Sequence, residues 1–356
     1  MKYVPGRSAA LPLMFIAIAA RLFCELALLY PDAHNAAWLC PIAGLLLYLP
    51  FAFALQRAAA LGNDSAWGNL ESRLPRFLSV LILLVLGALL LLDASAMMDV
   101  AAGTASFSIG DKAVITLELP LAALLALMVL LGPDAAGNNA RIGLYILGFL
   151  LVILALTQIT IYRPGWIAPI LGGGIHSILT GALRCAGSMA LLSLIWLFAV
   201  PDRARFGPML WGSVACLLAA VLLLGLQMLS PTFVGTELLR PARMEILLNN
   251  GRVAISLQFV YLIAWYGGLL HLLSSEAVTA ACIVKRLLPG LKLWIVALLE
   301  GIVVLLLSGS ERAQAFLAGT TAAWLFPVIS MLLLVSMATA GLAKGGGRKC
   351  GESSAS

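Results

Sequence analysis

Charged side chains are scarce in this sequence. Only 11% of its 356 residues are Asp, Glu, Lys or Arg, whereas 62% are hydrophobic and the mean hydropathy is +1.04. Soluble proteins carry roughly 25% charged residues, so a soluble fold is excluded, and disorder is excluded because it requires low hydrophobicity. The two-residue alternation of a membrane β-barrel, in segments of about ten residues, is also missing. The sequence therefore predicts an all-α, multi-pass integral membrane protein.

Signatures of common enzymes and metal sites are missing too. The sequence has no Walker, HExxH or GxSxG motif, and its histidines, His34, His176 and His271, are widely scattered. Its six cysteines include no CxxC pair, so neither a disulfide framework nor a zinc site is indicated. We therefore expect no enzyme, no catalytic residues, no metal and no cofactor. The net charge of +6 indicates basic cytoplasmic loops rather than nucleic-acid binding, because no basic patch is interleaved with aromatic residues.

Long apolar runs are abundant. A helix that crosses the bilayer needs about twenty mainly apolar residues, and such runs, bounded by Pro, Gly, Asn and charged residues, predict about ten transmembrane helices. The predicted spans are 9–30, 36–56, 77–102, 115–133, 142–162, 176–200, 208–230, 252–276, 291–308 and 318–342. Residues 1–342 thus form a single transmembrane permease-like domain, and the Gly- and Ser-containing stretch 343–356 is predicted to be a flexible cytoplasmic tail.

Basic residues are shared unevenly between the two predicted faces. With the N-terminus inside, fourteen of the 22 Lys and Arg fall on the cytoplasmic side and six on the outer side, while Arg21 and Arg184 lie within spans. Cytoplasmic loops are the ones enriched in Lys and Arg, so both termini are predicted to lie inside. Ten spans with this topology divide into five and five, which permits an inverted repeat, a common transporter architecture with substrate bound near the membrane midplane.

Several ionisable residues lie within the predicted spans. Arg21 is near the middle of the first span with Glu25 further out, and Asp93 and Arg184, in spans three and six, share a depth with Arg21. Glu300 stands alone in the ninth span. Charges at this depth are costly and commonly mark functional sites. The alternatives are a substrate, proton or ion site, or ion pairs that hold helices together, such as Arg21 with Glu25 along one helix.

Three further features admit a structural or a functional interpretation. Gly187 and Ser188 in the sixth span either allow close helix packing or mark a local unwinding whose backbone groups bind ligand. Tyr261 and Trp265 in the eighth span, at helical spacing, either pack within the bundle or line a pocket. Glu118, near the outer end of the fourth span, is expected to face the membrane interface.

Three stretches, 20–38, 162–182 and 237–265, match the pattern of a known family. The matching positions of the second stretch are Pro169, Gly174, Ile175, Ile178, Leu179, Gly181 and Ala182. In order, the stretches resemble the first hairpin, the segment before span six, and the outer loop with span eight of spore-germination permeases, the GerAB-like B subunits of germinant receptors. With the chain length and span number, this resemblance extends over essentially the whole chain.

The resemblance implies the amino acid–polyamine–organocation superfamily and a LeuT-like five-plus-five inverted repeat. It also implies a subunit of the cytoplasmic or spore inner membrane that senses a small nutrient, such as an amino acid, beside an A subunit and a C lipoprotein. Spans one, three, six and eight would line the ligand site. The candidate ligand-binding residues are Arg21, Glu25, Asp93, Arg184, Gly187, Ser188, Tyr261 and Trp265. The alternative function is a secondary active transporter of amino acids or polyamines, with a coupling carboxylate such as Asp93 or Glu300 and no need of partner subunits.

Overall fold

The fold was analysed in a computed structural model. It describes residues 3–33, 36–59, 64–72, 74–109, 115–158, 173–201, 254–308, 324 and 327–330. Within these ranges the chain is helical apart from turns and an isolated bridge between Gly6 and Val200. The all-α architecture expected from composition is confirmed, while the predicted spans 208–230 and most of 318–342 lie outside the described residues.

The helices follow the predicted spans closely. They are α1 (Arg7–Ala33), α2 (Leu39–Ala59), α3 (Ala66–Glu71), α4 (Arg76–Ile109), α5 (Ile115–Leu131), α6 (Pro133–Gln158), α7 (Ile175–Leu192), α8 (Leu194–Phe198), α11 (Ala254–Leu287) and α12 (Leu293–Leu307). The helices α4 and α11 each have 34 residues. At 1.5 Å per residue they are about 50 Å long, which exceeds a hydrocarbon core of about 30 Å.

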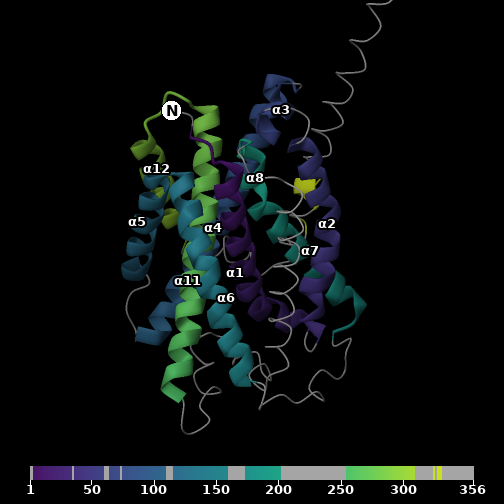
Figure 1. Cartoon of the computed structure of the whole chain (residues 1–356), viewed down its shortest axis with the longest axis vertical. Helices are drawn as coiled ribbons and strands as arrows, with labels where there is room; N and C mark the ends of the chain where they lie inside the picture. The colour runs from purple at the N-terminus through teal and green to yellow at the C-terminus, as the bar shows by residue number, and fades with distance from the viewer. Residues whose placement is uncertain are drawn as a thin grey trace, which may run out of the picture.

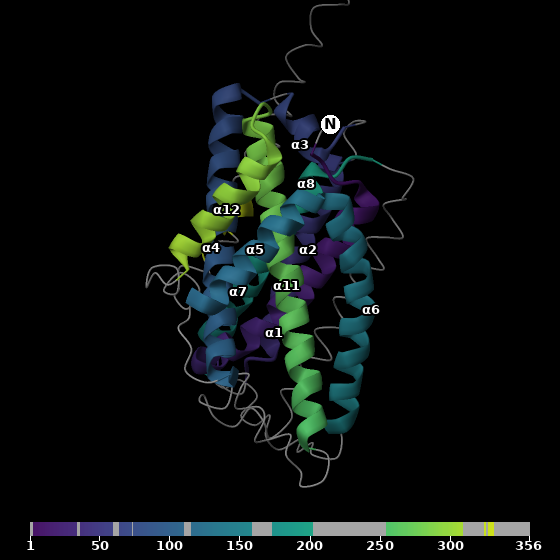
Figure 2. The same ribbon diagram turned by 90° about the vertical axis from the view of Figure 1, so that its left-hand side faces the viewer.

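Most of the helices run side by side along the long axis of the molecule (Figure 1). The first helix, α1, packs against α6, α7 and α11, and α7 packs in turn against α2. The long helix α11 also contacts α4, α5 and α12. Figure 2 shows α12 crossing α4 and α11 obliquely at the side of the bundle. Helices α1 and α11 therefore meet in the interior, where a polar side chain on either is shielded from lipid.

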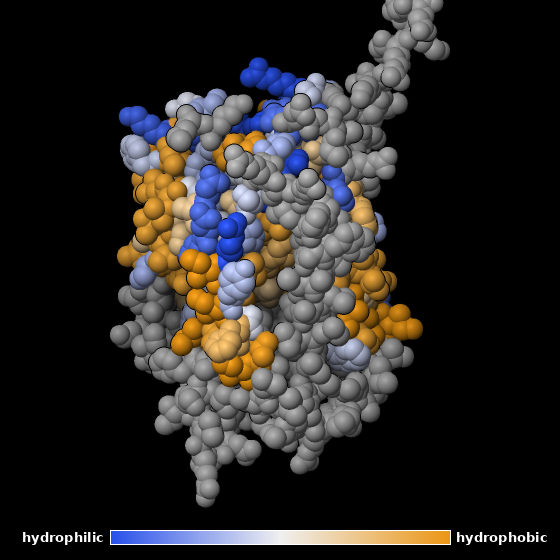
Figure 3. All heavy atoms as spheres, in the orientation of Figure 1, coloured by the Kyte–Doolittle hydropathy of each residue, from blue (hydrophilic) through white to orange (hydrophobic). Residues whose placement is uncertain are grey.

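Apolar side chains cover the outside of the bundle. Phe77, Tyr145 and Leu306 are among the most exposed large hydrophobic residues, and apolar side chains gather on both flanks in Figure 3, while hydrophilic ones gather at the end that holds the N-terminus. Among the described helices, four segments are long and apolar enough to cross a membrane: Leu39–Gln56, Arg76–Ala102, Ile175–Phe198 and Ile263–Leu287. This surface suits a lipid environment, because lipid tails solvate apolar side chains.

The connection between α5 and α6 is tighter than predicted. The axes of these helices turn by 116° at Gly132, whose φ of 90° is accessible to glycine but strained for other residues. Pro133 then opens α6, since its restricted φ suits the first position of a helix and its missing N–H is not needed there. The predicted start of this span at residue 142 is therefore too late, because the polar first turns of α6 hid the helix from a search for apolar runs.

The predicted unwinding at Gly187 and Ser188 is wrong. Helix α7 continues through both residues, and the irregularity lies at Ser193, between α7 and α8. The Ser188 hydroxyl donates to the Arg184 carbonyl at 3.2 Å. A serine that bonds the preceding turn in this way stays compatible with a helix.

Small residues instead bring α7 close to α2. A Cβ added to Gly181 would lie 2.6 Å from the Sγ of Cys40, and one added to Gly44 would lie 2.7 Å from the Cβ of Cys185. Real Cβ atoms do not approach other heavy atoms so closely, so glycine is required at both positions. The packing interpretation of the small residues therefore holds for the α2–α7 interface.

The end of the bundle that holds the N-terminus is tied together by polar contacts. The Tyr3 hydroxyl donates to the Val129 carbonyl at 2.8 Å, and Arg7 Nη2 donates to the Ala59 carbonyl at 3.0 Å. The Val200 amide donates to the Pro5 carbonyl at 2.9 Å. The segment before α1 thereby fastens the ends of α2, α5 and α8 to one another.

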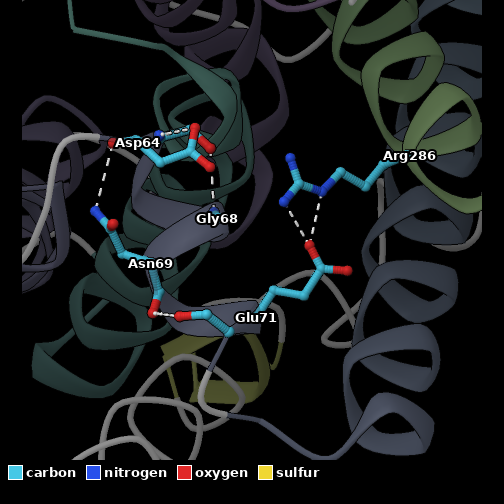
Figure 4. A network of polar contacts seen from close by, with 7 residues as sticks. Asp64, Gly68, Asn69, Glu71 and Arg286 are labelled. Carbon is cyan, nitrogen blue, oxygen red and sulfur yellow. Dashed lines mark hydrogen bonds and ion pairs between the residues drawn. The ribbon is translucent and has the colours of Figure 1, made fainter.

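The short helix α3 at the same end was not predicted. Its first turn is capped by Ser65, whose hydroxyl accepts from the Gly68 amide at 3.1 Å. Its last residue, Glu71, accepts from Arg286 Nε at 2.7 Å, which links α3 to the end of α11 (Figure 4). The helix has only six residues, too few to show a hydrophobic period in the sequence.

Candidate functional site

Two of the predicted site residues meet inside the bundle. Arg21 on α1 and Asp93 on α4 form an ion pair, with Arg21 Nη2 2.8 Å from Asp93 Oδ1. Both are fully buried, at 2% and 1% exposed. The prediction that they share one depth is confirmed. The alternative pairing of Arg21 with Glu25 involves a side chain outside the described residues.

A third ionisable residue, Glu276 on α11, joins this pair. It is 1% exposed, and its carboxyl lies within hydrogen-bonding reach of the Asp93 carboxyl and in the field of the Arg21 guanidinium. Helical side chains tilt toward the N-terminus of their own helix. Because α1 and α4 start at the N-terminal end of the bundle and α11 finishes there (Figure 1), the three side chains tilt toward one another. We call Arg21, Asp93 and Glu276 the central ionic cluster.

The cluster lies at the middle of the bundle's length. At 1.5 Å per residue, Arg21 is about 21 Å from the start of α1, Asp93 about 25 Å from the start of α4 and Glu276 about 16 Å from the end of α11. A bilayer with its headgroup regions is about 40–45 Å thick. The cluster therefore coincides with the hydrocarbon core of the membrane, where charges are most costly and most often functional.

Sequence reasoning missed Glu276. The eighth span was predicted to end at this residue, whereas α11 continues to Leu287, about three turns further. One signal was present in the sequence: residues 277–284 after Glu276 are uncharged, and the first charge is Lys285. Reading that stretch as a continuation of the span would have placed a carboxyl inside the membrane.

Small residues allow the helices around the cluster to approach. A Cβ on Gly268 of α11 would lie 3.1 Å from the Cβ of Ala20, the residue before Arg21 on α1. A Cβ on Gly143 of α6 would collide with the His271 ring of α11 and with Ile16 of α1. This three-helix contact excludes water and lipid from the side of the cluster formed by α1 and α11.

The candidate residues of the sixth span lie inside the bundle as well. Arg184, Gly187 and Ser188 are buried on α7, which packs against both α1 and α2. Arg184 therefore does not point to lipid, as a site residue requires. Participation of these residues in ligand binding stays a prediction.

The aromatic pair of the eighth span is described in part. Trp265 is buried on α11, and its ring meets the ring of Tyr266 edge to face with centroids 4.9 Å apart. This contact fits the packing interpretation. The side chain of Tyr261 lies outside the described residues.

Two more carboxyls are buried on neighbouring helices. The expectation that Glu118 faces the interface is wrong: it is buried, because α5 packs against α12. Glu300 on α12 is buried too, and neither of its oxygens has a hydrogen-bond partner among the described residues. Within the described ranges, no group of three or more His, Cys, Asp or Glu is placed to hold a metal ion.

Solved membrane proteins share this fold. A manganese transporter from Eremococcus coleocola, in complex with an aromatic bis-isothiourea substituted compound, matches 95% of this chain and 76% of its own, with 14% identity and a TM-score of 0.50. A mutant of the same transporter matches over the same shares with 14% identity and a TM-score of 0.52. No protein-family model and no curated protein matches the sequence. The likeness confirms the predicted LeuT-like all-α membrane fold.

Proposed function

We propose that this chain is a secondary transporter that binds a small polar solute at the centre of its helical bundle. The observation that carries the proposal is the central ionic cluster. An ion pair that serves packing alone is often replaceable by hydrophobic residues without loss of stability, whereas ionisable residues inside membrane bundles commonly mark substrate and ion pathways. A fold shared with solved transporters supports the same conclusion.

The charges of the cluster favour an organic solute over a metal ion. The Arg21 guanidinium occupies Asp93 Oδ1 at 2.8 Å, where it would compete with and repel a divalent cation. The buried Arg184 and Ser188 on α7 supply a cation and a hydroxyl suited to a carboxylate-bearing ligand. The proposed substrate class is therefore an amino acid or a related small nutrient, rather than the manganese carried by the protein of similar fold.

Uptake into proteoliposomes tests this proposal. The purified full-length chain should accumulate at least one radiolabelled amino acid of a panel, and should not accumulate manganese. The double variant Arg21→Met/Asp93→Leu keeps the volume of the pair and should assemble but fail to transport, while Glu71→Gln, at the polar end of the bundle, serves as a matched control. Transport by the double variant at the level of the parent protein would contradict a role of the cluster in transport.

A second candidate function is a germinant-receptor subunit, favoured by the resemblance of residues 162–182 to spore-germination permeases. In that case the chain senses the same class of nutrient beside an A subunit and a C lipoprotein in the spore inner membrane. Deleting the gene and measuring germination on an amino-acid panel tests it. Unchanged germination on every nutrient would remove this candidate and leave the transporter.

The orientation in the membrane follows from the basic residues. Arg76, Lys285, Arg286 and Lys292 lie at the starts of α4 and α12 and the end of α11, the same end of the bundle as Arg7. Because cytoplasmic loops are enriched in Lys and Arg, we propose that this end and the N-terminus face the cytoplasm. Labelling of a single cysteine introduced at residue 290 from each side of a sealed vesicle tests the orientation.

A further inference from the structure

The contact between Glu276 and Asp93 joins two groups that cannot bond while both are ionised. The two carboxyls lie within hydrogen-bonding reach, yet an ionised carboxylate only accepts hydrogen bonds. Neither oxygen of Glu276 has a donor among the described residues. A hydrogen bond between the two carboxyls therefore requires a proton on one of them.

The position of Arg21 decides which carboxyl holds this proton. Its guanidinium contacts Asp93 at 2.8 Å, and such a contact favours the ionised form of Asp93. Glu276 is then the neutral acid and donates to Asp93. In this state the cluster carries one positive and one negative charge, whereas ionised Glu276 would add a negative charge at 1% exposure, where a charge needs a partner.

Other charged groups on the helices packed against α11 are more distant in their effect. They are Asp99 on α4, Glu118 on α5, Asp134 and Arg141 on α6, and Glu300 on α12. Asp93 and Arg21 are the charged groups whose electrostatic action on the Glu276 carboxyl the structure shows. The protonation of Glu276 thus depends on the arrangement of α1, α4 and α11.

We propose that Asp93 and Glu276 form a proton-binding pair, with Glu276 as the carrier, and that protons are the ions that drive solute movement. A proton from water binds the Glu276 carboxylate to give the acid, and its release restores the carboxylate. Release places two negative carboxyls in contact and so favours the separation of α4 from α11, which links the proton to a conformational change. This coupling rests on the proposed function, whereas the bound proton rests on the geometry of the cluster.

Infrared spectroscopy of the purified full-length protein tests the bound proton. At neutral pH the parent protein should show the carbonyl band of a protonated carboxylic acid, and Glu276→Gln should remove it. Asp93→Asn should remove the same band, because Arg21 is then free to pair with an ionised Glu276. Glu118→Gln is the control, since it removes another buried carboxyl and should leave this band. A band that persists in Glu276→Gln would overturn the proposal.

Gradient-driven uptake tests the coupling. An inward proton gradient should raise solute uptake by the parent protein and by Glu118→Gln, and Glu276→Gln should lose this response. Uptake that follows a sodium gradient instead, or a response lost in Glu300→Gln and kept in Glu276→Gln, would overturn the coupling. If no solute is taken up under any gradient while the infrared band depends on Glu276, the transport function and the coupling are both wrong and the proton site is supported.

Discussion

Replacing Arg21 by Met should destabilise the folded protein strongly, and replacing Asp93 by Leu in addition should recover most of that loss. The ion pair is 2% and 1% exposed, so the removal of one partner leaves the other charge without its nearest counterion in the membrane interior. Breaking a buried pair in this way costs about 3–5 kcal/mol, whereas replacing both partners by hydrophobic residues of similar size is often neutral or stabilising. We expect the double variant to lie within about 1 kcal/mol of the parent.

The structure also predicts an asymmetry between the single variants. Asp93→Leu leaves Arg21 beside Glu276, whose carboxyl lies in the field of the guanidinium and can ionise to become its partner. Arg21→Met leaves two carboxyls with no such replacement in the cluster. Asp93→Leu should therefore fall at the lower end of the range of about 3–5 kcal/mol, and Arg21→Met at the upper end.

Unfolding in mixed micelles, followed by tryptophan fluorescence, measures these free energies. The control is the ion pair of Glu71 and Arg286, whose side chains are 37% and 27% exposed. Its removal through Glu71→Gln should cost about 1 kcal/mol or less, because water screens an exposed pair. If the losses of Arg21→Met and Asp93→Leu simply add in the double variant, the two residues do not interact and the cluster is refuted.

Three further substitutions test the packing of the bundle in the same unfolding assay. Gly44→Ala should cost about 1–3 kcal/mol through overpacking, because the new Cβ would lie 2.7 Å from a Cβ of α7, while Gly148→Ala, where nothing lies within 4 Å, should cause no loss. Tyr48→Phe should cost about 0.5–1.5 kcal/mol by removing the buried hydroxyl contact with Ser193 Oγ at 2.5 Å. Gly132→Ala should cost about 1–2 kcal/mol, because its φ of 90° is unfavourable for alanine, and an unchanged free energy would show that the turn relaxes.

The membrane class and most helices were determined by the sequence alone. Few charges and long apolar runs leave a chain no other stable state than a helical membrane bundle, since each backbone group must be bonded within the segment. The helices accordingly match the predicted spans, apart from ends set by polar residues, as at Pro133 and beyond Glu276. Run length detects only the apolar middle of a helix, so the polar start of α6 and the carboxyl-containing part of α11 were missed.

The shared depth of Arg21 and Asp93 was also predictable, because depth follows from counting residues along a helix. Their pairing was not. A count gives height but no rotation about the helix axis, so Arg21 had Glu25 on its own helix as an equally good predicted partner. Only the packing of α1 against α11, through Ala20 and Gly268, and of α4 against α11 decides which side chains share the interior.

The state of α7 was likewise decided by tertiary structure. Glycine and serine in a membrane helix suit either an unwound segment or a close contact, and the same residues support both. In this fold α2 packs against α7 closely enough that Gly181 and Gly44 have no room for a Cβ, and the Ser188 hydroxyl is bonded within its own helix. Local sequence sets what a backbone can do, and the neighbouring helix selects which of these states is stable.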